Sequence, residues 1–167
     1  FIMNNNIVVF DLETTGLMPG CDEIIEISAL KCKSGKITDE FSTLVCPDDI
    51  WKVGSFVTRL TGITQDMLTG QPNICNVLPH LINFIGDEVI VAHNANFDIN
   101  FIYDSCEEIL NCNFSNNFVD TLRISRRILP ELENHRLSTI AQYFNIDTVG
   151  AHRSLKDCKI VQTCYEE

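Results

Sequence analysis

Residues 7–16 read IVVFDLETTG, an apolar run that gives way to two carboxylates, two hydroxyls and a glycine. A short run rich in β-branched residues predicts a strand that is buried on both faces. Because side chains two apart along a strand point the same way, Asp11 and Glu13 should project together. Neighbouring carboxylates repel each other unless a cation joins them, and such hard oxygen ligands suit Mg²⁺ or Mn²⁺. Taken alone, the pair also fits a plainer role, in which Glu13 solubilises the strand end and Thr14 or Thr15 caps the next element.

The chain has 167 residues, 45% of them hydrophobic, which allows one domain with a sizeable core. We expect a single domain over residues 1–167, with residues 1–5 either left over from cloning or forming a flexible N-terminus. Apolar runs stay well short of the roughly 20 residues that cross a bilayer, and the first residues lack a signal-peptide pattern. The eight cysteines lack the close spacing of zinc or redox motifs. We therefore expect reduced thiols and a cytoplasmic protein that does not contact membranes.

The net charge of −11 disfavours a large nucleic-acid interface, since nucleic-acid backbones are normally met by basic faces. This objection weakens if several of the acids form one metal site. Two bound divalent ions would return four positive charges at the place where a phosphate must sit.

Further elements follow from hydrophobic spacing. Runs at 24–30 and 37–45, separated by a turn composition at 33–36, predict an antiparallel hairpin beside the first strand. Pro79 suggests that the helix over 73–85 is kinked or begins late. Additional strands are predicted at 89–92 and 118–120, and additional helices within 51–66 and over 98–110, 121–129, 137–144 and 155–165. We expect an α/β fold with a mixed five-stranded sheet flanked by helices on both faces.

Acidic residues recur at the ends of these buried elements. Asp98 follows the strand that ends at Ala92, and Asp157 lies in the last predicted helix, five residues after His152. Four carboxylates and an imidazole are the groups that phosphoryl transfer with two metal ions requires. The carboxylates would hold the ions, and the imidazole would accept the proton of an attacking water.

Three motifs carry a resemblance to a known family: DLETTG at 11–16, AHNANFD at 92–98 and HRSLKD at 152–157. In order and separation they resemble the exonuclease motifs of the DEDDh 3′-to-5′ exonuclease superfamily, the DnaQ-like group that includes bacterial proofreading exonucleases. The resemblance covers about residues 6–164. It implies a ribonuclease-H-like fold, a general-base role for His152 and four metal-binding catalytic acids, Asp11, Glu13, Asp98 and Asp157. Arg153 stands where a sister subgroup carries tyrosine, which favours the histidine subgroup.

The resemblance further implies a metal-dependent exonuclease that uses two divalent metal ions, Mg²⁺ or Mn²⁺. Its substrate would be the single-stranded 3′ end of DNA or RNA, with DNA proofreading as the expected role and nucleoside 5′-monophosphates as products. A replicative DNA polymerase subunit is the expected protein partner. Substrate contacts would come from Thr14, Gly62, Ile63 and Phe97.

Several alternatives stay open at this point. Phe97 fits a core aromatic as well as a base-stacking residue, and His93 with Asn94 fits a loop whose side chains satisfy backbone groups. Arginines in the C-terminal half either track phosphates or lie on solvated helix faces: Arg123, Arg126, Arg127, Arg136 and Arg153. Competing functions are an RNA-trimming exoribonuclease of the same family, a non-catalytic docking module of a polymerase or helicase, and an endonuclease with an open groove.

Overall fold

The computed structural model describes residues 6–167, so the expectation for residues 1–5 lies outside the described residues. Its centre is a five-stranded sheet with the strand order β3-β2-β1-β4-β5. β1 pairs antiparallel with β2 and β2 with β3, whereas β4 and β5 continue the sheet in parallel with β1. The strands are β1 (Asn6–Thr14), β2 (Ile24–Lys33), β3 (Lys36–Leu44), β4 (Val89–Ala92) and β5 (Phe118–Asp120). The predicted α/β fold with a mixed sheet is therefore confirmed.

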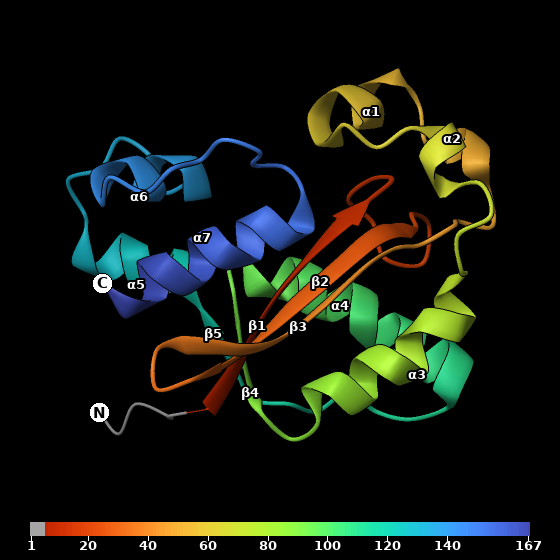
Figure 1. Cartoon of the computed structure of the whole chain (residues 1–167), viewed down its shortest axis with the longest axis horizontal. Coiled ribbons are helices and arrows are strands. Elements are labelled where there is room, and N and C mark those ends of the chain that lie inside the picture. Colours follow the sequence, from red (N-terminus) through yellow and green to blue (C-terminus); the bar gives the residue numbers. More distant parts are fainter. Residues whose placement is uncertain (1–5) are drawn as a thin grey trace.

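Helices cover both faces of this sheet (Figure 1). They are α1 (Ser55–Thr61), α2 (Gln65–Leu68), α3 (Ile74–Ile85), α4 (Ala95–Ser105), α5 (Thr121–Ile128), α6 (Leu137–Tyr143) and α7 (Ser154–Glu166), with a 3₁₀ turn at Ile50–Lys52 and a π-helical turn at Cys106–Leu110. Figure 1 groups α5, α6 and α7 on one side of the view and α1 and α2 on the other.

The alternation of side chains along β1 assigns its two faces. Val8, Phe10 and Leu12 pack with α3 and α4 in the larger core cluster. Ile7 and Val9 point to the opposite face and pack against α7. Because side chains repeat every second residue in a strand, the carboxylates that continue this second series also face α7. Strand periodicity thus places Asp11 and Glu13 opposite the last helix.

Two element boundaries bear on the predictions from the sequence. β1 ends at Thr14, so Asp11 and Glu13 lie at its carboxyl end as predicted, and Glu13 still pairs with Glu26 of β2. Of the two alternatives raised by Pro79, the late start is excluded: helix α3 begins at Ile74, and Asn73 caps it by accepting a hydrogen bond from the backbone N–H of Asn76.

The eight cysteines are free thiols. Among residues 6–167, no helix has both the length and the apolar character needed to span a membrane.

Candidate active site

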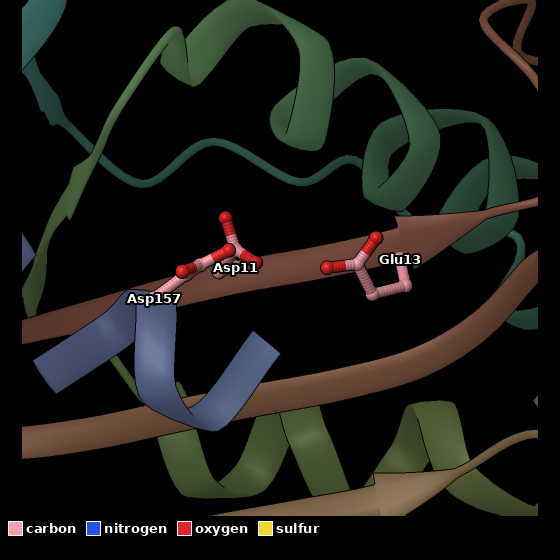
Figure 2. Close-up of side chains that lie close together, drawn as sticks. All are labelled: Asp11, Glu13 and Asp157. Atoms are coloured by element: carbon pink, nitrogen blue, oxygen red, sulfur yellow. The ribbon is translucent and has the colours of Figure 1, made fainter. Parts of the chain in front are cut away.

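Three carboxylates predicted from the sequence meet at one point, between β1 and α7. Asp11 and Glu13 project from the same strand and Asp157 reaches toward them from the first turn of α7 (Figure 2). One ligand oxygen from each of the three lies within 4.8 Å of the others. The donor set consists of carboxylate oxygens alone, which is the chemistry that hard divalent cations such as Mg²⁺ and Mn²⁺ prefer. These residues therefore fit a divalent metal ion.

The fourth predicted acid, Asp98, lies beside this cluster and not within it. It is in the first turn of α4 and is only 3% exposed. Its Oδ1 accepts a hydrogen bond of 3.1 Å from the backbone N–H of Leu12, which lies between the two acids of β1. This bond fixes the start of α4 against the carboxyl-terminal part of β1.

His152 precedes α7 with a left-handed backbone, φ 65°, a conformation that is uncommon for residues other than glycine. This conformation turns its backbone N–H toward Asp157, whose Oδ2 accepts the bond at 3.1 Å. The residue itself is exposed. Unfavourable backbone conformations persist only where the surrounding structure holds them, and they are found most often at functional sites.

An ion pair with a buried carboxylate holds the segment that follows His152. Glu26, 3% exposed on β2, accepts hydrogen bonds from Arg153 Nε at 3.0 and 3.2 Å and from Arg153 Nη2 at 2.5 Å. It also accepts the backbone N–H of Ser154 at 2.9 Å. The N-cap residue, Arg153, makes no side-chain cap bond, and Glu26 supplies an acceptor to the first turn from a distant strand.

Burial and mutual repulsion dominate the electrostatics of the four acids. Burial raises the pKa of Asp11 well above its usual range, and Asp98, Asp157 and Glu13 raise it further. For Glu13, burial followed by the charges of Asp157 and Glu26 raises the pKa to about 8. Burial also raises the pKa of Asp98 and that of Asp157. Repulsion between the carboxylates contributes to these raised pKa values, and a bound cation would relieve that repulsion.

The four residues expected to contact substrate differ in exposure. Thr14 is half-buried and its hydroxyl donates to the carbonyl of Gly16 at 2.6 Å. Gly62 is exposed at the end of α1, but the side chain of Ile63 is fully buried, so a contact from Ile63 would have to use its backbone. Phe97 is partly buried, with its ring centroid 5.1 Å from that of Phe101.

Other predicted candidates have structural partners. His93 bonds through Nδ1 to the hydroxyl of Thr121 at 3.0 Å and through Nε2 to the carbonyl of His135 at 2.9 Å, which favours the loop-stabilising alternative. Arg153, considered as a phosphate contact, is engaged with Glu26. Glu26 is a site residue that was not predicted from the sequence, although a single acid inside the apolar run at 24–30 was an available signal.

This sheet, with its acids on β1, α4 and α7, defines a nuclease domain of the ribonuclease-H-like type. The exonuclease family model RNase_T matches residues 8–165, so the chain belongs to this exonuclease family and, through it, to the DnaQ-like DEDDh superfamily. The chain is 38% identical over 159 residues to DNA polymerase III subunit epsilon of Aquifex aeolicus, covering 95% of this chain and 78% of that protein. It is 43% identical over 157 residues to the PolC-type DNA polymerase III of Caldanaerobacter subterraneus subsp. tengcongensis, covering 94% of this chain but 11% of that protein. The chain therefore spans about a tenth of the PolC-type relatives.

Solved structures agree with this assignment. Exonuclease X in complex with 5′ overhanging duplex DNA superposes with a TM-score of 0.75 at 27% identity, covering 95% of this chain and 88% of that one. Escherichia coli exonuclease I in its zinc-bound complex with single-stranded DNA gives a TM-score of 0.87 at 17% identity, covering 98% of this chain and 40% of that one. The second likeness supports the fold alone.

Proposed function

We propose that residues 1–167 form one metal-dependent exonuclease domain that removes nucleotides from the 3′ end of single-stranded DNA. The observation that carries the proposal is the cluster of Asp11, Glu13 and Asp157 within 4.8 Å, beside the buried Asp98 and the exposed His152. The products would be nucleoside 5′-monophosphates.

The four acids would hold two divalent ions, Mg²⁺ or Mn²⁺. Asp11 would contact both ions, which is supported by the effect of Asp98, Asp157 and Glu13 in all raising its pKa. Glu13 and Asp157 would complete one ion's ligands and Asp98 would serve the other. Such ions, when bound, lower the pKa of a water and neutralise charge on the leaving oxygen.

His152 would act as general base by accepting the proton of the attacking water at its imidazole. Its backbone is held on both sides, by Asp157 at its own N–H and by Glu26 at Arg153 and Ser154. This anchoring fixes the backbone from which the exposed side chain projects. Thr14, the backbone at Gly62 and Ile63, and Phe97 would contact the terminal nucleotide.

The relatives support a role in replication. Those named as DNA polymerase III subunit epsilon and PolC-type polymerase motivate the proposal that this domain proofreads beside a replicative DNA polymerase. An acidic domain with a net charge of −11 gains from such a partner, since the partner supplies affinity for the nucleic acid.

The test is digestion of 5′-labelled single-stranded DNA, and of RNA of the same sequence, with Mg²⁺ or Mn²⁺ and with chelator. We expect a ladder of DNA products that shortens from the 3′ end, depends on metal and disappears in Asp11→Asn. Preferential shortening of RNA would replace the DNA assignment with RNA trimming. Cleavage of a circular single strand would indicate an endonuclease, and no hydrolysis of either polymer would indicate a docking module.

A further inference from the structure

A basic hollow lies at the carboxyl ends of β4 and β5, apart from the acidic cluster. It is an open depression of about 530 Å³, and its polar lining comes from His93, Asn94, Arg126, Asn134, His135 and Arg136. We refer to it as the basic hollow. Its lining includes two arginines and no carboxylate, although the chain as a whole carries a net charge of −11.

The two arginines of the basic hollow are not neutralised by the protein. Arg126 on α5 and Arg136 just before α6 are both exposed, and within residues 6–167 neither forms an ion pair. The buried acid nearby, Asp120, lies beneath the lining and forms an ion pair with neither arginine. Its Oδ1 accepts the backbone N–H groups of Asn94 at 2.9 Å and Leu122 at 3.0 Å.

The histidines of the basic hollow serve as its frame. His93 is tied to Thr121 and to the carbonyl of His135, and His135 Nε2 bonds to the carbonyl of Leu129 at 3.0 Å. Asn134 uses its side-chain oxygen to accept from the backbone N–H of Arg136 at 3.1 Å and from the Thr139 hydroxyl at 2.7 Å. This leaves as donors the amide NH₂ of Asn134 and the two guanidinium groups, beside the exposed side chain of Asn94. Such a set matches a phosphate, which guanidinium groups can bind in bidentate fashion.

The position of the basic hollow relates it to the acidic cluster. His93 and Asn94 directly follow β4, which pairs in parallel with β1, and Asn94 precedes the helix that carries Asp98. The carboxyl ends of parallel strands lie at one edge of a sheet, and neighbouring strands are about 5 Å apart. One nucleic-acid strand can therefore reach both places.

We propose that the basic hollow binds backbone phosphate of the nucleic-acid strand, upstream of the 3′-terminal nucleotide that the acids cleave. The inference rests on the proposed exonuclease function and adds a second contact region to it. Arg126 and Arg136 supply charge where the acidic surface would otherwise repel the strand. The basic hollow therefore affects long substrates and not the chemistry of the terminal phosphodiester.

The test compares two double variants with the same change in charge. Arg126→Gln with Arg136→Gln empties the basic hollow of charge, whereas Arg123→Gln with Arg127→Gln removes two exposed arginines of α5 outside it. Binding of a fluorescent oligothymidylate of about 12 nucleotides is followed by anisotropy in chelator over a range of salt concentrations. Hydrolysis of the p-nitrophenyl ester of thymidine 5′-monophosphate, which carries one phosphate, is measured with Mn²⁺.

For the variant in the basic hollow, we expect about tenfold weaker oligothymidylate binding and a salt slope smaller by about 0.7 per lost phosphate contact. Ester hydrolysis should match the wild type, and the α5 control should bind within about twofold of it. Equal losses in both double variants, or unchanged binding in the first, would overturn the proposal; unchanged binding would direct attention to an acidic peptide as the occupant. A wild type that binds through the basic hollow but hydrolyses neither the ester nor the oligothymidylate would refute the exonuclease function alone.

Discussion

Replacing Arg153 with alanine should leave the buried carboxylate of Glu26 without its cation. The Glu26 side chain is 4% exposed and that of Arg153 is 42% exposed, so the pair is open to water from the arginine side only. Breaking a fully buried pair costs about 3–5 kcal/mol, and water entering from the exposed side should reduce this to about 2–3 kcal/mol. Ser154 would still donate to Glu26, but one backbone N–H does not replace three guanidinium contacts.

The assay is urea unfolding followed by circular dichroism at pH 7 in chelator, for the wild type, Arg153→Ala, Glu26→Gln and the double variant. The double-mutant cycle should give a coupling energy of about 2 kcal/mol. Relief of the repulsion between Glu26 and the acids of β1 occurs in both arms of the cycle and therefore cancels. Lys159→Ala is the matched control, since it breaks an exposed pair with Glu40 and should cost less than about 0.5 kcal/mol.

Arg153→Ala should also lower kcat by more than it changes KM, because Arg153 adjoins His152 and anchors the start of α7. If Arg153→Ala loses no more unfolding free energy than the Lys159→Ala control does, the argument that Glu26 depends on this cation is refuted. A higher KM with an unchanged kcat would instead show that Arg153 contacts the substrate.

Three further predictions concern the acidic cluster. Asp11→Asn should abolish hydrolysis by at least about a thousandfold yet raise the melting temperature in chelator, because it removes the carboxylate that the other acids repel; a lower melting temperature would contradict this account. His152→Asn should keep the left-handed backbone and the fold, since asparagine tolerates that conformation, while kcat falls about 10²–10⁴-fold. A clearly lower melting temperature for this variant than for the wild type would assign the histidine a structural role. In chelator, the melting temperature should fall as pH rises from about 4.5 to about 8, because folding raises the pKa of Glu13 from 4.5 to about 8 and the folded state holds its proton longer. Glu13→Gln should flatten that slope, and Mg²⁺ or Mn²⁺ should stabilise the wild type more at pH 8 than at pH 6; a slope unchanged by Glu13→Gln would show that other groups cause it.

Much of the site follows from local sequence, because the relevant regularities are local. The period of two along residues 7–14 places Asp11 and Glu13 on one face, and helical spacing after His152 places Asp157 in the first turn of α7. The order of strands and helices likewise predicts the mixed sheet. These properties depend on neighbours within one element, so the sequence alone determined them.

Tertiary structure decided which elements meet. Glu26 and Arg153 are 127 residues apart, and nothing in the spacing of either segment indicates that β2 supplies an acceptor to the start of α7. The full burial of Ile63 and the use of both ring nitrogens of His93 likewise depend on contacts with distant segments. The basic hollow, too, exists only because the segments after β4 and β5 converge with the one before α6. Periodicity reports which way a side chain points, whereas its partners depend on how the whole chain packs.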